Sequence, residues 1–222
     1  MLKKTNFCVS SDLINEAVNT ISNENFKQVI NRPTGNFFYD PWVISEEFRG
    51  TVWEKIYDSL PTIKGEARII ILKPPQCYFS HSDIDDRWHL NLTSKKSYLI
   101  NLDNNTMFKL ITDGYWYDFD AGNRHTAVNF GNRPRIQLVV RQLLIRSSRN
   151  DLVSVKIKSK LNDLEDARFE FDDSISNILN MINKQNALNN FTPNSDEVSF
   201  DIAPEFLKNL ESIDKKNFEI LL

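Results

Sequence analysis

The sequence lacks the features that mark a disulfide-rich or a membrane protein: it has two cysteines, three histidines and no long apolar run in 222 residues. Two cysteines are too few for the disulfide framework of a small secreted domain, so a cytoplasmic location is expected. No window holds about 18 consecutive apolar residues, which is the length that a membrane span needs. The N-terminal residues lack the apolar core of a secretion signal, so we expect neither a membrane segment nor export.

A basic excess is also lacking. The formal net charge is −3, and the charges are unevenly spread: residues 1–150 hold 19 basic and 16 acidic side chains, whereas residues 151–222 hold 8 and 14. Nucleic-acid binding needs a concentrated patch of lysine and arginine, and neither part of the chain has one. We therefore expect a small-molecule, peptide or protein substrate and no nucleic acid.

Helical spacing of apolar residues is confined to the two ends of the chain. It predicts one helix over residues 10–28 and another over residues 45–60, both behind residues that can cap a helix. Near the C-terminus a helix is predicted behind Pro204, where proline suits the first turn. A further helix is predicted on one apolar stripe, made of Ile175, Ile178, Leu179 and Ile182.

The middle of the chain has a different pattern. Residues 66–145 contain six short segments rich in β-branched and aromatic residues: ARIIILKP, WHLNLT, SYLINL, TMFKLIT, GYWYDFD and RIQLVVRQLLI. Turn-forming pairs and triplets such as NN, DG and AGN separate them. No helical stretch lies between these segments, so they predict antiparallel strands in a barrel or sandwich and disfavour a parallel sheet.

The expected fold class is therefore mainly β with flanking helices, on a double-stranded β-helix core (jelly-roll, cupin-like). We expect residues 1–147 to form this domain, with the first helices as supports and the core at about residues 60–147. Residues 148–222 are expected to form a helical, acidic C-terminal region. Because its helices are amphipathic and need a partner surface, that region is a candidate for homodimer formation.

The three histidines are concentrated in two places. His81 and His89 lie in HSDIDDRWHL, and His125 lies in NRHTAVNFGNRPR. In extended chain, positions i and i+2 face the same side, so His81 and Asp83 can point together. Two imidazoles and one carboxylate on one side of a metal suit non-haem Fe(II). His81, Asp83 and His125 are thus predicted as metal ligands and as the catalytic centre.

An arginine follows at a suggestive distance. Arg135 comes ten residues after His125 and opens the segment RIQLVV. The guanidinium fork matches a carboxylate through two parallel hydrogen bonds, so a dicarboxylate that bridges iron and Arg135 is predicted. Arg133 is the substitute if Arg135 faces outward.

Taken together, these motifs resemble a known family. H-x-D, then R-x-H, then a distal histidine followed ten residues later by arginine is similar to the 2-oxoglutarate oxygenases of the aspartyl/asparaginyl β-hydroxylase family, over residues 66–145. The resemblance implies iron binding by His81 and His125, contact with 2-oxoglutarate by Arg87 and His89, and a grip on its distal carboxylate by Arg135.

One position departs from the family. The animal aspartyl hydroxylases have glycine where this chain has Asp83, so the site is more similar to the full triad of the wider superfamily, which includes bacterial free-proline hydroxylases. The resemblance implies Fe(II)-dependent hydroxylation of an amino acid of the Asp, Asn or Pro type, free or in a polypeptide. Dioxygen would be the oxidant, and 2-oxoglutarate would be converted to succinate and carbon dioxide.

Other interpretations remain open. A cupin-like module could hold a metal or a small acid without catalysis, and a cupin isomerase or metal hydrolase would act without oxygen. His89 competes with His81 for the metal, and Tyr78 is a further candidate for contact with the cosubstrate. Asp85 and Asp86 are interpreted as a polar loop lip. Four aromatic residues are candidates to line the pocket, about half of them facing outward: Trp88, Tyr115, Trp116 and Tyr117.

Overall fold

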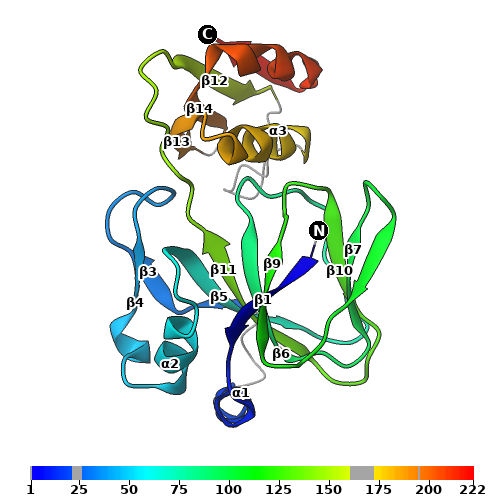
Figure 1. The fold of residues 1–222 in the computed structure, drawn as a ribbon. Helices are drawn as coiled ribbons and strands as arrows, with labels where there is room; N and C mark the ends of the chain where they lie inside the picture. The colour runs from blue at the N-terminus through cyan, green and yellow to red at the C-terminus, as the bar shows by residue number, and fades with distance from the viewer. Residues whose placement is uncertain (1, 22–26, 161–172, 195) are drawn as a thin grey trace. The chain divides into compact units, whose positions relative to one another are not determined.

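The computed structural model describes residues 2–21, 27–160, 173–194 and 196–222. The chain divides into two compact units (Figure 1). The N-terminal unit comprises Met1–His81 and Asp85–Leu143, and the C-terminal unit comprises Ser82–Ile84 and Leu144–Leu222. The predicted boundary at residue 147 thus lies four residues after the division at Leu143.

The N-terminal unit is built from antiparallel sheets, as predicted. Its largest sheet has six strands in the order β1-β9-β6-β11-β5-β2 and a second has the order β10-β7-β8. The strands of the large sheet are β1 (Leu2–Cys8), β2 (Lys27–Val29), β5 (Lys64–Leu72), β6 (Arg87–Thr93), β9 (Tyr115–Phe119) and β11 (Arg135–Gln142). The smaller sheet is formed by β7 (Ser97–Asn101), β8 (Thr106–Lys109) and β10 (His125–Asn129), and a hairpin is formed by β3 (Asn31–Pro33) and β4 (Trp42–Ile44).

The predicted helices are shorter than expected. The first, α1, covers Ser11–Asn19, and the far end of its predicted range, Lys27–Val29, is strand; residues 22–26 lie outside the described part of the chain. The second is divided into a 3₁₀ turn, η1 (Glu46–Phe48), and α2 (Val52–Asp58). The division occurs at Gly50, whose φ of +70° is incompatible with a continuous right-handed helix.

One face of the six-stranded sheet is apolar and covered by helices. Alternate residues of four strands enter the same buried cluster as Ala17 of α1 and Ile56 of α2. From the strands these are Ala67, Ile69, Ile71, Leu90, Leu92, Trp116, Ile136, Leu138 and Val140. Such alternation fixes the opposite residues of each strand on the other face.

That second face, here called the polar face, carries buried polar and charged groups. Its buried members are Glu66 of β5, His89 and Asn91 of β6, and Arg135 and Gln137 of β11. Gln137 donates a hydrogen bond to Asn91 across the β6–β11 pair. Because burial of polar groups is costly, five of them on one sheet face indicate a site rather than a core.

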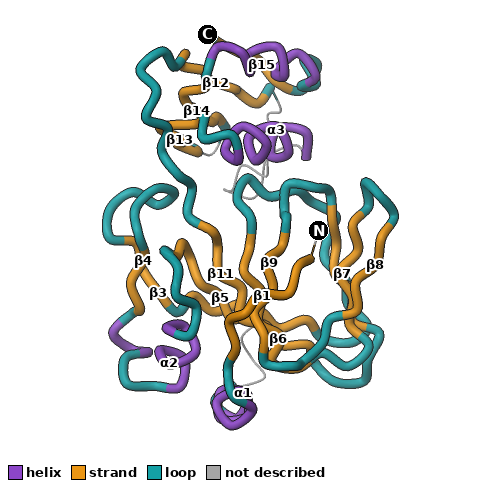
Figure 2. The backbone as a smooth tube through the Cα atoms, in the orientation of Figure 1, coloured by secondary structure: helices purple, strands orange, loops and turns teal. Residues whose placement is uncertain are grey.

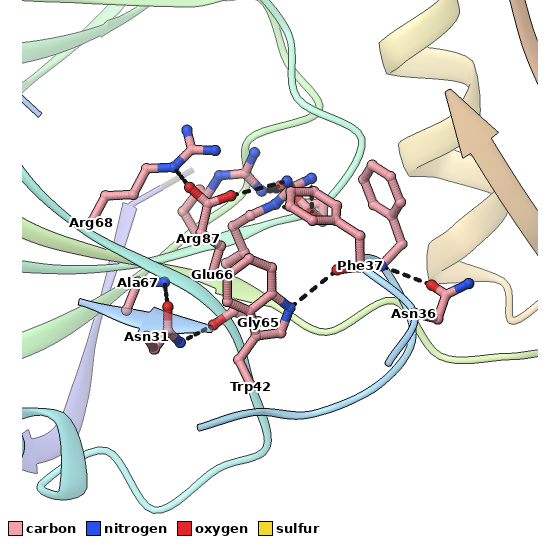
Figure 3. Close-up of polar contacts among 12 residues, drawn as sticks. Asn31, Asn36, Phe37, Trp42, Gly65, Glu66, Ala67, Arg68 and Arg87 are labelled. Atoms are coloured by element: carbon pink, nitrogen blue, oxygen red, sulfur yellow. Dashed lines mark hydrogen bonds and ion pairs between the residues drawn. The ribbon is translucent and has the colours of Figure 1, made fainter. Parts of the chain in front are cut away.

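The hairpin β3–β4 is joined to the large sheet by a buried amide. The Asn31 side chain donates to the carbonyl oxygen of Gly65 at 2.9 Å and accepts from the backbone N–H of Ala67 at 2.7 Å (Figure 3). It also donates to the Tyr57 hydroxyl of α2 at 3.2 Å. Asn31 thereby fixes the backbone on both sides of Glu66, which lies on the polar face.

The C-terminal unit corrects the expectation of a helical region. Its sheet has the order β13-β14-β12-β15, and strands are as evident there as helices in Figure 2. The strands are β12 (Val153–Ser159), β13 (Leu188–Pro193), β14 (Glu197–Ile202) and β15 (Phe218–Leu221), with the helix α3 (Asp173–Lys184) and the 3₁₀ helix η2 (Pro204–Ser212). The stripe predicted on α3 is confirmed, since Ile175, Ile178, Leu179 and Ile182 are all buried. No helix in the described ranges is long and apolar enough to cross a bilayer.

Candidate metal centre

The two segments that carry the predicted ligands are paired through their backbones. His81 and His125 form an isolated antiparallel bridge, in which each backbone N–H donates to the other's carbonyl oxygen at 3.0 and 2.9 Å. His125 is also the first residue of β10 and pairs with Asn101 of β7. The bridge brings residues 44 positions apart into contact, with the ring centroids 4.5 Å from each other.

Asp83 completes the group. One possible ligand atom from each of His81, Asp83 and His125 lies within 4.8 Å of the other two. His125 is buried, and the other two residues are partly exposed, so the group has one side open. Two neutral nitrogen donors and one carboxylate at this separation fit a divalent transition metal, and they match the donor set of non-haem iron sites.

Hydrogen bonds determine which nitrogen of each ring faces the metal position. Nδ1 of His81 lies 2.9 Å from the carbonyl oxygen of Phe79, and Nδ1 of His125 lies 2.8 Å from that of Asn123. A carbonyl oxygen only accepts, so each Nδ1 carries the proton and Nε2 carries the lone pair. Metal-binding histidines are typically oriented in this way, by a hydrogen bond from the nitrogen that does not bind the metal.

An aromatic ring connects the metal group with the polar face. The Phe119 ring of β9 meets the His125 ring edge-on at a centroid separation of 4.7 Å. On its other side it lies 5.2 Å from the ring of His89. His89 therefore reaches the neighbourhood of the metal group through Phe119, and the metal group itself contains His81 and not His89.

Arg135 is the most unusual charged group of the polar face. Only 1% of the residue is exposed, and neither Nε nor Nη1 has a hydrogen-bond partner among the described residues. The guanidinium carbon lies 5.3 Å from the centroid of the Tyr78 ring. Burial lowers the pKa of Arg135, which nevertheless stays charged at neutral pH. Arg133, the predicted substitute, is exposed.

Arg87 lies in a different environment. It forms an ion pair with Asp85, which also accepts from Nε and Nη2 of Arg141 at 2.6 Å each. Glu66 pairs with Arg68 (Figure 3) and lies 3.9 Å from Arg141, so the five residues form one network of buried and partly buried charges. The expectation that Asp85 belongs to a polar lip is wrong, because 2% of it is exposed. The sequence interpretation missed both Asp85 and Arg141.

The aromatic candidates divide between the two faces. Trp116 is buried in the helix-covered core, and Trp88 packs against that core. Tyr117 lies opposite His89 on the polar-face side of β9, and its hydroxyl donates to Asp113 at 2.9 Å. The alternation along each strand therefore removes the two tryptophans from the pocket.

A hollow of about 550 Å³ lies in the C-terminal unit, and it differs chemically from the metal group. It is lined by apolar residues of η2 and β15 and by three lysines and two glutamates, with no histidine or cysteine. The chemistry of the chain thus concentrates at the metal group and not at this hollow.

Comparisons with known proteins add little to this geometry. No protein-family model matches the sequence, and no curated protein does. A solved structure described as "Crystal structure of CapF with inhibitor 3-isopropenyl-tropolone" is similar at 15% identity, with a TM-score of 0.30, over 36% of this chain and 25% of that chain. A likeness of this size carries no conclusion about fold or function.

Proposed function

We propose that this protein is an Fe(II)- and 2-oxoglutarate-dependent dioxygenase that hydroxylates an amino acid, free or within a polypeptide. The observation that carries the proposal is the joint presence of a His81–Asp83–His125 group and of the buried Arg135 guanidinium, two of whose donors have no hydrogen-bond partner among the described residues. A metal group alone would serve many functions. A buried cation in addition favours an anionic ligand.

The arrangement of sheets supports the finer assignment of a double-stranded β-helix. Phe119 of the large sheet packs with Leu99 and Ala127 of the smaller one, so side chains of two antiparallel sheets meet in one cluster. In this fold the ligand position lies between two such sheets. The resemblance to the aspartyl/asparaginyl β-hydroxylase family rests on six residues of the motifs: His81, Asp83, Arg87, His89, His125 and Arg135.

The chain's own residues have separable tasks in this proposal. His81, Asp83 and His125 would hold iron, which supplies open coordination positions and the redox chemistry for activating dioxygen. Arg135 would bind the distal carboxylate of 2-oxoglutarate and so orient the cosubstrate. Phe119 covers one side of His125 and limits the access of water there. Arg87 pairs with Asp85, so its role in contacting 2-oxoglutarate requires that this pair opens or shares a donor.

The proposal is tested without oxygen first. Iron-loaded protein mixed anaerobically with 2-oxoglutarate should develop a weak visible charge-transfer band, because the cosubstrate would chelate the metal. Asp83→Asn should lose the band, whereas Asp103→Asn should keep it, since Asp103 bonds the backbone N–H of Arg124 and is no ligand. Iron binding without the band would support a passive metal-binding module. With oxygen, succinate release screened over free amino acids and short peptides would identify the substrate by a gain of one oxygen atom.

A further inference from the structure

The segment that carries Asp83 belongs by its contacts to the C-terminal unit. That unit comprises Ser82–Ile84 in addition to Leu144–Leu222. The N–H of Ser82 donates to a carboxylate oxygen of Asp173 at 2.9 Å, across 91 positions of the sequence. Asp173 is the first residue of α3. The residue that directly precedes a predicted metal ligand is thus bound to a helix far away in the chain.

His81 and Asp83 are held in different ways. The backbone of His81 is fixed by its bridge with His125, in which both N–H groups donate. Ser82 and Asp83 lie beyond that bridge and in no strand. Positions i and i+2 face the same side only in extended chain, and rotation about the two soft dihedrals of Ser82 would turn the Asp83 carboxylate away from His81. The convergence of the two ligands therefore needs a restraint at Ser82.

Helix α3 fixes the acceptor of this hydrogen bond. Its residues Ile175, Leu179 and Ile182 are fully buried, and the helix packs against η2 and β13. A carboxylate that accepts from a backbone N–H forms a stronger hydrogen bond than a neutral acceptor does. Asp173 therefore restrains the N–H of Ser82 from a position that the apolar stripe of the helix determines.

The neighbours of Asp83 are buried, whereas Asp83 itself is partly exposed. Ser82 and Ile84 are 8% and 6% exposed. The hydroxyl of Ser82 has no hydrogen-bond partner among the described residues, so the side chain adds no polar restraint there. The contact of Ser82 with Asp173 is made by the backbone alone. It therefore acts on the path of the chain between the two ligands.

We propose that Asp173 is a positioning residue for the metal group: by holding the N–H of Ser82, it keeps the Asp83 carboxylate directed toward His81 and His125. Asp173 is not a member of the group itself. The inference deepens the proposed function, and it rests on that function only in taking the three residues of the group as metal ligands. Its consequence is that α3, in the C-terminal unit, contributes to metal affinity.

The test measures the affinity of the full, metal-free chain for Co(II), a divalent ion whose visible absorption reports its ligands. Asp173→Ala should bind Co(II) about tenfold more weakly, because loss of a group that orients metal ligands typically lowers metal affinity by about 10- to 100-fold. Asp173→Asn should bind it nearly as well as wild-type protein, since the amide oxygen can still accept the hydrogen bond. Urea unfolding checks that each variant is folded under the conditions of the titration.

A matched control separates positioning from stability. Asp214 also accepts a backbone N–H within the C-terminal unit, from Lys216 at 2.9 Å. Asp214→Ala should lower the free energy of unfolding and leave the Co(II) affinity unchanged. If Asp173→Ala does not fold, Asp173→Ser replaces it, because serine is favoured at a helix start and its oxygen lies one bond nearer the backbone. The same loss of affinity is expected from this variant.

The outcomes distinguish this inference from the oxygenase proposal. Folded Asp173→Ala with wild-type affinity for Co(II) would overturn the positioning role, even if the wild type develops the charge-transfer band with iron and 2-oxoglutarate. Equal losses in Asp173→Ala and Asp173→Asn would overturn the hydrogen bond as its cause. Wild-type protein that binds no Co(II) would remove the metal group and this inference with it. Weaker Co(II) binding by Asp173→Ala, in a protein whose wild type shows no such band, would support the inference and reject the oxygenase.

Discussion

Strand β11 carries one partly buried and one fully buried arginine on the same face, and their surroundings differ. Arg141, near one end, donates two hydrogen bonds of 2.6 Å to Asp85, and its side chain is 13% exposed. Arg135, at the other end, is 1% exposed and has two donors without partners. The two arginines lie six positions apart on the same strand.

The difference between the two arginines indicates that they have different roles. A buried ion pair such as Arg141–Asp85 is satisfied within the chain and clamps β11 to the start of β6. A buried cation without a carboxylate costs stability in the folded protein, and selection for stability alone would replace it. In the proposed function, Arg135 is the position where stability is given up for a ligand, so substitutions of the two arginines should have opposite effects on stability.

The largest effect is expected from Arg141→Met. It leaves Asp85 with one guanidinium partner fewer at a side chain that is 3% exposed. Breaking a buried pair in this way typically costs about 3 kcal/mol in the free energy of unfolding. Urea unfolding of ligand-free protein measures the change. Arg133→Met, at an exposed position of the turn before β11, should change it by less than about 0.5 kcal/mol.

Arg135→Met should give the reverse result. Ligand-free protein should be as stable as the wild type or up to about 1 kcal/mol more stable, because a hydrophobic residue replaces an uncompensated charge. Affinity for 2-oxoglutarate should fall by about 100-fold, which corresponds to roughly 2.7 kcal/mol of binding free energy. Equilibrium unfolding and titration calorimetry on one preparation measure both. A loss of stability similar to that of Arg141→Met would mean that Arg135 has a structural role.

The contrast between the arginines also shows what the sequence could reveal. Arg135 was identified by its spacing from His125, and His81 with Asp83 by the i, i+2 rule; these are local signals. Asp85 stands in the acidic run DIDDR, which resembles a solvated loop. Its burial depends on Arg141, 56 positions away, and on the pairing of β6 with β11. Long-range pairing of this kind leaves no local signature.

Three further elements differ from the predictions, and for two of them, β12 and the helix broken at Gly50, the sequence contains a local signal. Residues 153–159, VSVKIKS, alternate apolar and polar side chains, which is the period of a strand and not of a helix. The segment that forms β10, HTAVN, is short and rich in polar residues, so its strand character comes from pairing with β7 and from the bridge to His81. The helix expected over residues 45–60 failed at Gly50, where a single positive φ interrupts it.

The smallest effect is expected at the partly buried contact between Tyr117 and Asp113. Tyr117 donates to Asp113, which also pairs with Lys4 at 2.8 Å. Burial, and next the hydrogen bond to Asp113, raise the pKa of Tyr117 from 10.0 to about 12. The folded protein favours the neutral phenol, so this stabilisation is complete below pH 10 and is lost as the pH rises toward 12.

Exposure limits the size of that contribution to less than about 1 kcal/mol, far below the cost expected for Arg141→Met. The measurement is the difference in free energy of unfolding between wild-type protein and Tyr117→Phe at pH 8 and at pH 11. The difference should shrink at the higher pH, since the wild-type phenol then begins to ionise and the variant has none. A difference that is constant with pH would show that the Tyr117–Asp113 contact does not contribute to the free energy of unfolding. Among the polar contacts of this sheet, only the more deeply buried ones, such as Arg141–Asp85, would then contribute to stability.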